Sequence, residues 1–139
     1  MKEIVGVIDT IAVPAPKVWE VIAAIGGVDK WASMITSCRV EGGGPGAKRF
    51  CTMADGTDLE EVVEEVDHGT MRFRYRIVRG LPVESYQGTI EIRAAGNAHS
   101  EITWYSAYAA SEEIAEGFRQ MLRGMLPGLI KGLEHYCRN

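Results

Sequence analysis

The stretch VEGGGPGAKRF, Val40–Phe50, decides the fold class, because glycine-rich loops occur both in phosphate-binding α/β folds and in hairpins. A P-loop needs Lys followed by Ser or Thr, but Arg49 follows Lys48. The looser dinucleotide fingerprint fits part of the glycine spacing, yet both motifs need a helix directly afterwards to supply amide donors. Residues 47–53, AKRFCTM, are few, contain an aromatic residue that favours a strand and run toward another turn. We therefore predict a hairpin between two strands, and no nucleotide bound at residues 42–46.

Length and composition predict one domain over residues 1–139, large enough to bury a core. The net charge is −4 and no basic run occurs, which argues against a nucleic-acid partner. No apolar stretch reaches membrane-spanning length, and the first residues lack the apolar region of a signal peptide. We therefore expect a cytoplasmic protein without stable membrane insertion, and its oligomeric state stays open.

Cysteine and histidine positions predict neither a metal site nor a cofactor. The three cysteines, Cys38, Cys51 and Cys137, are odd in number and lack metal-ligand spacing, and the three histidines are scattered. Free thiols in a reducing cytoplasm are the simplest interpretation. Cys38 and Cys51 lie on the strands that flank the glycine loop and can come close together, but we interpret both as packing residues.

Hydrophobic periodicity predicts the remaining elements. Their order is one strand, two helices, six strands and one long helix. Six consecutive strands joined by turns predict an antiparallel sheet, because parallel strands need long crossover connections. The predicted strands cover residues 3–12, 36–41, 47–53, 58–67, 70–78, 85–94 and 99–109, and the predicted helices cover 15–25, 28–35 and 111–137.

The C-terminal helix is predicted to be amphipathic, with one flank of small residues. Gly124, Gly128 and Gly132 recur every four residues, and Pro127 predicts a kink. A highly curved sheet wrapped around this helix would bury the apolar stripe and leave a cavity wherever helix and sheet separate. The stripe consists of Ile114, Phe118, Met121, Leu122, Met125, Leu129, Leu133 and Tyr136.

This order of elements, together with PAPKVW, the EGGGPGAKRF hairpin and MRFRYRIV, resembles the helix-grip superfamily over nearly the whole chain. That superfamily contains the START lipid-transfer domains, the birch-pollen-allergen proteins and the polyketide cyclase/dehydrase and lipid-transport group (SRPBCC), which the chain resembles most. The resemblance implies an α+β fold with a curved seven-stranded antiparallel sheet, two short helices after the first strand and a hydrophobic cavity under the C-terminal helix. Because the superfamily contains binders, carriers and enzymes, the fold leaves the activity undecided.

A more distant resemblance, to the plant lachrymatory factor synthases, implies that Arg49 and Glu61 are catalytic. In those enzymes an arginine follows the glycine loop, a glutamate lies on the next strand, and both serve proton transfer. In a dry cavity a guanidinium can hold a carbonyl or enolate oxygen, and a carboxylate near it can move a proton. Such a pair suits enolisation, aldol cyclisation or dehydration, whereas a structural salt bridge remains the alternative.

Strand alternation bears on whether these two side chains face inward. Arg49 shares its face with Cys51 and Met53, which favours an inward arginine. For Glu61 the direction depends on the turn at residues 67–70. A three-residue turn places Glu61 inside, whereas a two-residue turn places Glu64 there instead, because a slip of one residue reverses every side chain.

We predict that the protein binds a small, largely hydrophobic organic molecule and carries a cyclase- or dehydratase-type activity. The alternatives are a non-catalytic carrier of lipid or polyketide-like metabolites and a protein-interaction module. An inward Arg–Glu pair favours the enzyme, and an all-apolar cavity favours the carrier. A filled cavity with an exposed apolar patch favours the interaction module. The predicted ligand contacts, beyond Arg49 and Glu61, are Trp31, Tyr75, Tyr86, Trp104, Tyr108, Phe118, Met121 and Met125.

Overall fold

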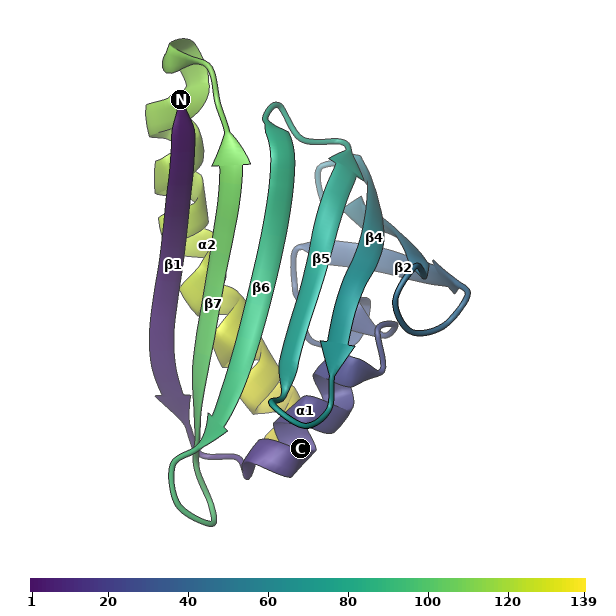
Figure 1. The fold of residues 1–139 in the computed structure, drawn as a ribbon, viewed down its shortest axis with the longest axis vertical. Coiled ribbons are helices and arrows are strands. Elements are labelled where there is room, and N and C mark those ends of the chain that lie inside the picture. The colour runs from purple at the N-terminus through teal and green to yellow at the C-terminus, as the bar shows by residue number, and fades with distance from the viewer.

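A computed structural model describes residues 1–139 and shows a seven-stranded antiparallel sheet with one long C-terminal helix (Figure 1). This is the helix-grip arrangement, and the predicted fold class is confirmed. Neither helix is both long enough and apolar enough to cross a bilayer. The elements are β1 (Lys2–Ile11), α1 (Ala15–Ala23), the 3₁₀ turn η1 (Val28–Lys30), β2 (Ile35–Glu41), β3 (Lys48–Met53), β4 (Asp58–Asp67), β5 (Arg72–Arg79), β6 (Glu84–Ala94), β7 (Ser100–Ala109) and α2 (Glu112–Arg138).

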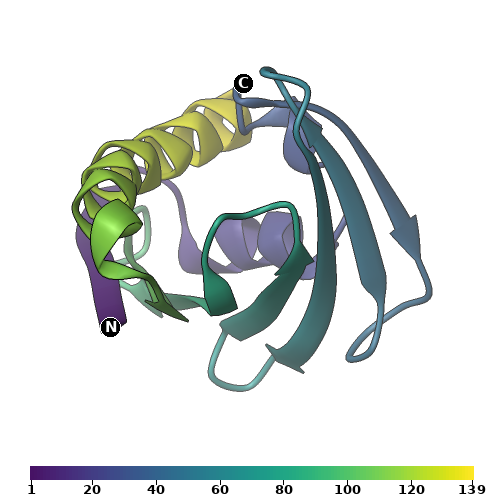
Figure 2. The ribbon, with the colours of Figure 1, turned by 90° about the horizontal axis from the view of Figure 1, so that it is seen from above.

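The sheet has the order β1-β7-β6-β5-β4-β3-β2, so the first strand lies beside the last and the hairpins follow one another to the other edge. In Figure 2 the strands curve around one side of the interior and α2 runs along the other. Most of the apolar stripe of α2 packs against this interior, because a helix with one apolar face must cover it against another element, while Tyr136 at its end is 39% exposed. The buried residues of α2 are Ala115, Phe118, Leu122, Leu126, Leu129, Ile130, Leu133 and Cys137.

Of the three glycines on the small-residue flank of α2, only Gly132 allows a close contact with another part of the chain. A β-carbon at Gly132 would lie 2.2 Å from the carbonyl oxygen of Trp31, so only glycine lets the helix and this loop meet. Nothing lies within 4 Å of a β-carbon built at Gly124 or Gly128. The helix continues through Pro127 as a single element.

The glycine-rich loop is a hairpin corner, as predicted. Gly42, Gly44 and Gly46 have positive φ, a conformation that other residues adopt only at a cost. At its end the chain already pairs with β4, because Gly46 N–H donates to the carbonyl oxygen of Val63 over 2.7 Å. Residues 48–53 form a strand and no helix, so the loop lacks the helix N-terminus of a phosphate site.

The prediction of a helix over residues 28–35 is wrong, since only the 3₁₀ turn η1 forms there. A helix over residues 28–35 would bond Ile35 N–H to the carbonyl oxygen of Trp31, but this N–H donates to the carbonyl oxygen of Ala32 over 2.9 Å, and Ile35 pairs with Met53 on β3. The carbonyl oxygen of Met34 also accepts a hydrogen bond of 2.8 Å from Ala54 N–H, which holds this segment against the end of β3. The chain therefore enters β2 at Ile35 instead of continuing a helix.

Candidate functional site

A cavity lies between the concave face of the sheet, α2 and the segment that contains α1 and η1. Its volume is about 90 Å³, counted as the space open to the centre of a water molecule. One water needs about 10–15 Å³ on this measure, so the cavity holds several waters or a small organic molecule. Among the 24 lining residues, only Arg49 and Glu61 are charged. Met121, which is 40% exposed, and the half-buried Leu81 mark where the lining approaches the surface.

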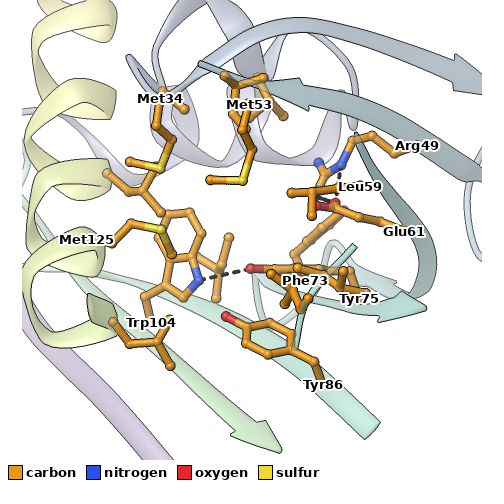
Figure 3. Close-up of a pocket in the computed structure, with 18 of the residues that line it drawn as sticks. Met34, Arg49, Met53, Leu59, Glu61, Phe73, Tyr75, Tyr86, Trp104 and Met125 are labelled. Atoms are coloured by element: carbon orange, nitrogen blue, oxygen red, sulfur yellow. Dashed lines mark hydrogen bonds and ion pairs between the residues drawn. The ribbon is translucent and has the colours of Figure 1, made fainter. Parts of the chain in front are cut away.

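Arg49 and Glu61 form a buried ion pair in the cavity wall (Figure 3). They lie directly opposite each other on β3 and β4, and they are 7% and 6% exposed. The Nε atom of Arg49 donates to Oε1 of Glu61 over 2.6 Å, and Nη2 lies 2.5 Å from the same oxygen. The Nη1 atom of Arg49 donates over 2.8 Å to the carbonyl oxygen of Ile25, just after α1.

The pair leaves polar groups for a ligand. A guanidinium has five N–H donors, and the contacts with Glu61 and Ile25 use three of them, so two remain. Glu61 accepts both contacts through Oε1, and Oε2 makes no hydrogen bond within the protein. A ligand oxygen can therefore approach Arg49 while the second carboxylate oxygen accepts a proton.

The surroundings keep Arg49 charged. Burial by itself would lower the pKa of Arg49, but attraction to the Glu61 carboxylate, with a further contribution from Tyr75, raises that pKa overall. The guanidinium carbon also lies 5.7 Å from the ring centroid of Phe73 and 5.3 Å from that of Tyr75, within the range of cation–π attraction. The cavity wall thus holds a charged guanidinium, paired with the Glu61 carboxylate, in otherwise apolar surroundings.

Glu61 faces inward because β4 contains a bulge. The β4–β5 connection is the four-residue loop 68–71, so neither turn length considered from the sequence occurs. An even-numbered loop alone would place Glu64 inside. However, the pairing register shifts by one residue between Val63 and Glu65, which reverses the alternation along the rest of β4. Glu61 and Val63 therefore turn inward, and Glu64 contacts Arg76 on the outer face.

Two tyrosines add neutral hydroxyl groups to the cavity wall. The indole Nε1 of Trp104 donates to the Tyr75 hydroxyl over 3.3 Å, and the Tyr86 hydroxyl lies 2.5 Å from Oγ of Ser106. Burial raises the pKa of Tyr75 well above its ordinary value and that of Tyr86 to about 12. Both hydroxyls are therefore protonated at neutral pH, and the Tyr75 hydroxyl, which accepts the hydrogen bond from Trp104, can donate its own proton to a ligand oxygen.

The sequence matches the profile of the polyketide cyclase / dehydrase and lipid transport family over residues 4–135, nearly its whole length. The chain belongs to this family. Among proteins with curated descriptions, none matches it. The family assignment covers cyclases, dehydrases and lipid transporters together, so it is consistent with a ligand cavity and leaves the reaction undecided.

Solved structures confirm the fold of this polyketide cyclase/dehydrase family member. An uncharacterised protein from Bacillus thuringiensis is similar with a TM-score of 0.88 and 20% identity, covering 99% of this chain and 100% of that chain. Norcoclaurine synthase from Thalictrum flavum, in complex with dopamine and hydroxybenzaldehyde, is similar with a TM-score of 0.79 and 18% identity. The match covers 97% of this chain and 86% of the synthase chain. Ara h 8.0201 is similar with a TM-score of 0.81 and 19% identity, and the match covers 99% of this chain and 98% of that chain. At these identities the similarity shows the fold alone.

The structure brings most of the predicted ligand contacts to the cavity of this family member, but excludes Tyr108. That side chain is buried beyond the cavity, where its ring stacks on Tyr86 and meets Phe118 edge-on at 4.9 Å. Strand alternation predicted its inward face correctly, but could not show that α2 covers this end of the sheet. The predicted residues that do line the cavity are Arg49, Glu61, Trp31, Tyr75, Tyr86, Trp104, Phe118, Met121 and Met125.

Two further methionines of the lining were missed. Met34 and Met53 point into the cavity from the side opposite Tyr75, close to Met125 (Figure 3). Alternation had already placed Met53 on the inward strand face with Arg49, but it was not counted among the predicted ligand contacts. Met34 lies just before β2, in a segment predicted to be helical, and had no such signal. Flexible thioether side chains can adapt their shape to an apolar ligand.

Gly88 is a second feature that sequence reasoning missed. A β-carbon there would lie 2.3 Å from Cζ of Tyr75, so the ring of Tyr75 lies across the bare backbone of β6. This position brings the tyrosine hydroxyl to the indole of Trp104. No three His, Cys, Asp or Glu side chains come together as a set of metal ligands.

Proposed function

We propose that the protein binds a small, largely apolar organic molecule with a carbonyl oxygen, and that Arg49 and Glu61 catalyse a cyclase- or dehydratase-type proton transfer on it. The observation that supports this proposal is the isolation of the ion pair, the only charged residues in an otherwise apolar cavity. A buried ion pair contributes little net stability compared with apolar residues of similar volume. Stability alone is therefore a weak reason for its presence.

The proposed reaction uses both members of the pair. A free N–H of Arg49 binds the carbonyl oxygen of the ligand, and Oε2 of Glu61 removes a proton from the adjacent carbon. The electron pair of that C–H bond moves to the oxygen, and Arg49 stabilises the enolate charge. The enolate then either attacks a second carbonyl, whose oxygen takes the proton from Glu61, or expels a β-hydroxyl group that leaves with this proton as water.

A carrier without catalytic activity is the second candidate, and one observation favours it. The Arg49 side chain also binds the carbonyl oxygen of Ile25, so the ion pair ties the end of α1 to the sheet and has a structural role. In a carrier, Arg49 would only orient the polar end of a lipid or polyketide-like metabolite. The open cavity argues against the interaction module, which predicted a filled interior.

The two candidates differ in carbon–hydrogen exchange, which can be measured without the natural substrate. The probe is 2-tetralone, an aryl-fused ketone with acidic α-protons, whose deuterium uptake in D₂O is followed by NMR. We expect the protein to accelerate the exchange and Glu61→Gln to lose about 10²–10⁴-fold of this acceleration, the usual contribution of a general base. Glu64→Gln is the matched control, since it removes a carboxylate from the same strand on the outer face.

Binding is measured separately from exchange. An apolar fluorescent probe, ANS, should bind the native protein stoichiometrically, and native mass spectrometry of the purified protein shows which molecule copurifies. Saturable binding of 2-tetralone with no acceleration of its exchange supports the carrier and refutes the proposed reaction. Absence of both ANS and 2-tetralone binding refutes the ligand-binding function itself.

A further inference from the structure

Two thiols face each other beside the ion pair. Cys38 on β2 and Cys51 on β3 are directly opposed in the antiparallel register, and their Sγ atoms are 3.4 Å apart. Directly opposed residues of antiparallel strands have Cα atoms about 4.5–5.5 Å apart, which lies within the range that a disulfide spans. The S–S distance in a disulfide is about 2.05 Å, so a side-chain movement of roughly 1.4 Å closes the bond.

The two thiols differ in their surroundings. Cys38 is half-buried, whereas Cys51 is 3% exposed. The hydrogen bond from the Cys51 thiol lowers the pKa of Cys38 to about 7 against the effect of burial, with help from the charge of Arg49 and the backbone N–H of Val28. The same hydrogen bond, together with burial, raises the pKa of Cys51. Cys38 is therefore the reactive thiolate and Cys51 the thiol that remains protonated beside it.

We propose that Cys38 and Cys51 are an oxidation site, at which hydrogen peroxide converts the two thiols into a reversible disulfide. The Cys38 thiolate attacks one peroxide oxygen, the O–O bond breaks, and the second oxygen leaves as hydroxide, which takes the proton released by Cys38 and becomes water. The sulfur of Cys51 then attacks the resulting sulfenic acid. The S–S bond forms, the S–O bond breaks, and hydroxide leaves with the Cys51 proton as a second water. The two sulfurs supply the two electrons that reduce the peroxide.

This site is independent of the proposed reaction, because it needs neither a ligand nor turnover. Both cysteines are also packing residues, as predicted, since Cys51 belongs to the buried core and Cys38 packs against it, and the register of β2 and β3 brings them together. The third cysteine, Cys137, lies on α2, where burial raises its pKa. It provides an internal reference thiol within the same chain.

The test uses the full chain, reduced and then exposed to one equivalent of hydrogen peroxide. After denaturation, iodoacetamide labels the remaining thiols, and mass spectrometry counts them. We expect loss of the mass of two hydrogen atoms, label on Cys137 only, a peptide linked between Cys38 and Cys51, and full recovery with dithiothreitol. The rate should rise with pH, reach half its maximum near pH 7, where Cys38 is half ionised, and level off above that, instead of having its midpoint near the ordinary thiol pKa of 9.0.

Three substitutions separate this site from general oxidation. Cys38→Ser changes the half-buried member and should abolish the linked peptide, while Cys137→Ser should leave it unchanged. Cys51→Ser gives a second loss-of-function variant, and if this buried change prevents folding, Cys38→Ser still decides the question. A sulfinic or sulfonic acid at Cys38 without a disulfide, a disulfide between two chains, or three labelled thiols would each overturn the proposal.

Discussion

Removing one partner of the buried ion pair should destabilise the protein far more than removing both. Arg49→Leu leaves the Glu61 carboxylate buried without its counter-charge and takes the hydrogen bond from the carbonyl oxygen of Ile25. Glu61→Leu leaves the guanidinium in the same apolar wall. In the double variant, Arg49→Leu with Glu61→Leu, no uncompensated charge remains, and two apolar side chains extend the existing lining.

The expected sizes follow from the burial of the pair, whose side chains are 9% and 8% exposed. Breaking such a pair costs about 3–5 kcal/mol, whereas replacing both members by apolar residues ranges from neutral to a gain of about 1–4 kcal/mol. The loss of the Ile25 contact moves the double variant toward the neutral end, since an unsatisfied buried carbonyl costs about 1–3 kcal/mol. With a urea m-value of about 2 kcal/mol per molar, each single variant should lower the unfolding midpoint by about 2 M.

Urea unfolding followed by tryptophan fluorescence and by circular dichroism measures these differences. Arg76→Leu is the control, because Arg76 on β5 pairs with Glu64 on the outer face of β4, the strand that also holds Glu61, and an exposed pair contributes at most about 1 kcal/mol. A double variant as unstable as the single variants would refute the reasoning, because the pair would then be needed for stability and its presence would no longer favour a function. Single variants as stable as Arg76→Leu would show that water reaches the pair.

Three further predictions concern other parts of the molecule. Gly132→Ala should lower the free energy of unfolding by about 1–3 kcal/mol, because the added β-carbon meets the Trp31 carbonyl. Gly124→Ala adds a β-carbon in open space and should raise the free energy of unfolding by up to about 1 kcal/mol. Urea unfolding measures both changes. Raising the pH from about 10 to about 12 should destabilise the fold, because the pKa of Tyr86 is higher in the folded state than in the unfolded chain and its ionisation therefore favours unfolding. Circular dichroism measured against pH follows this loss of structure, and a flat profile would contradict it. Residues 42–46 should bind no nucleotide, so amide shifts that saturate with micromolar ATP, GTP or NADH at this loop would show the opposite.

Local pattern was sufficient to predict the seven strands, α1, α2 and their order, but not the short 3₁₀ turn η1 in place of a helix. Strand-forming residues, alternation and flanking turns identified all seven strands, and the glycine loop before a strand-forming segment favoured a hairpin over an α/β phosphate site. The apolar stripe identified α2 as the element that the sheet must cover. These features depend on residues a few positions apart, and both the strand period of two and the helix period of 3.6 are visible in the sequence.

The direction of Arg49 was also predictable, because β3 is short and regular. For Glu61 the sequence left two alternatives, and the bulge in β4 decided between them. A bulge is a property of the pairing between two strands and has no reliable signature in either strand alone.

Only the tertiary structure decided which inward residues line the cavity and which side chains lie side by side. Tyr108 follows the same alternation as Trp104, but α2 and Phe118 close that end of the interior. Cys38 and Cys51 lie 13 positions apart in the chain, and the register of β2 and β3 brings their sulfurs together. Sequence periodicity gives the face of the strand or helix on which a side chain lies. The neighbours of that side chain depend on strand register and helix placement, which are set by contacts between distant parts of the chain.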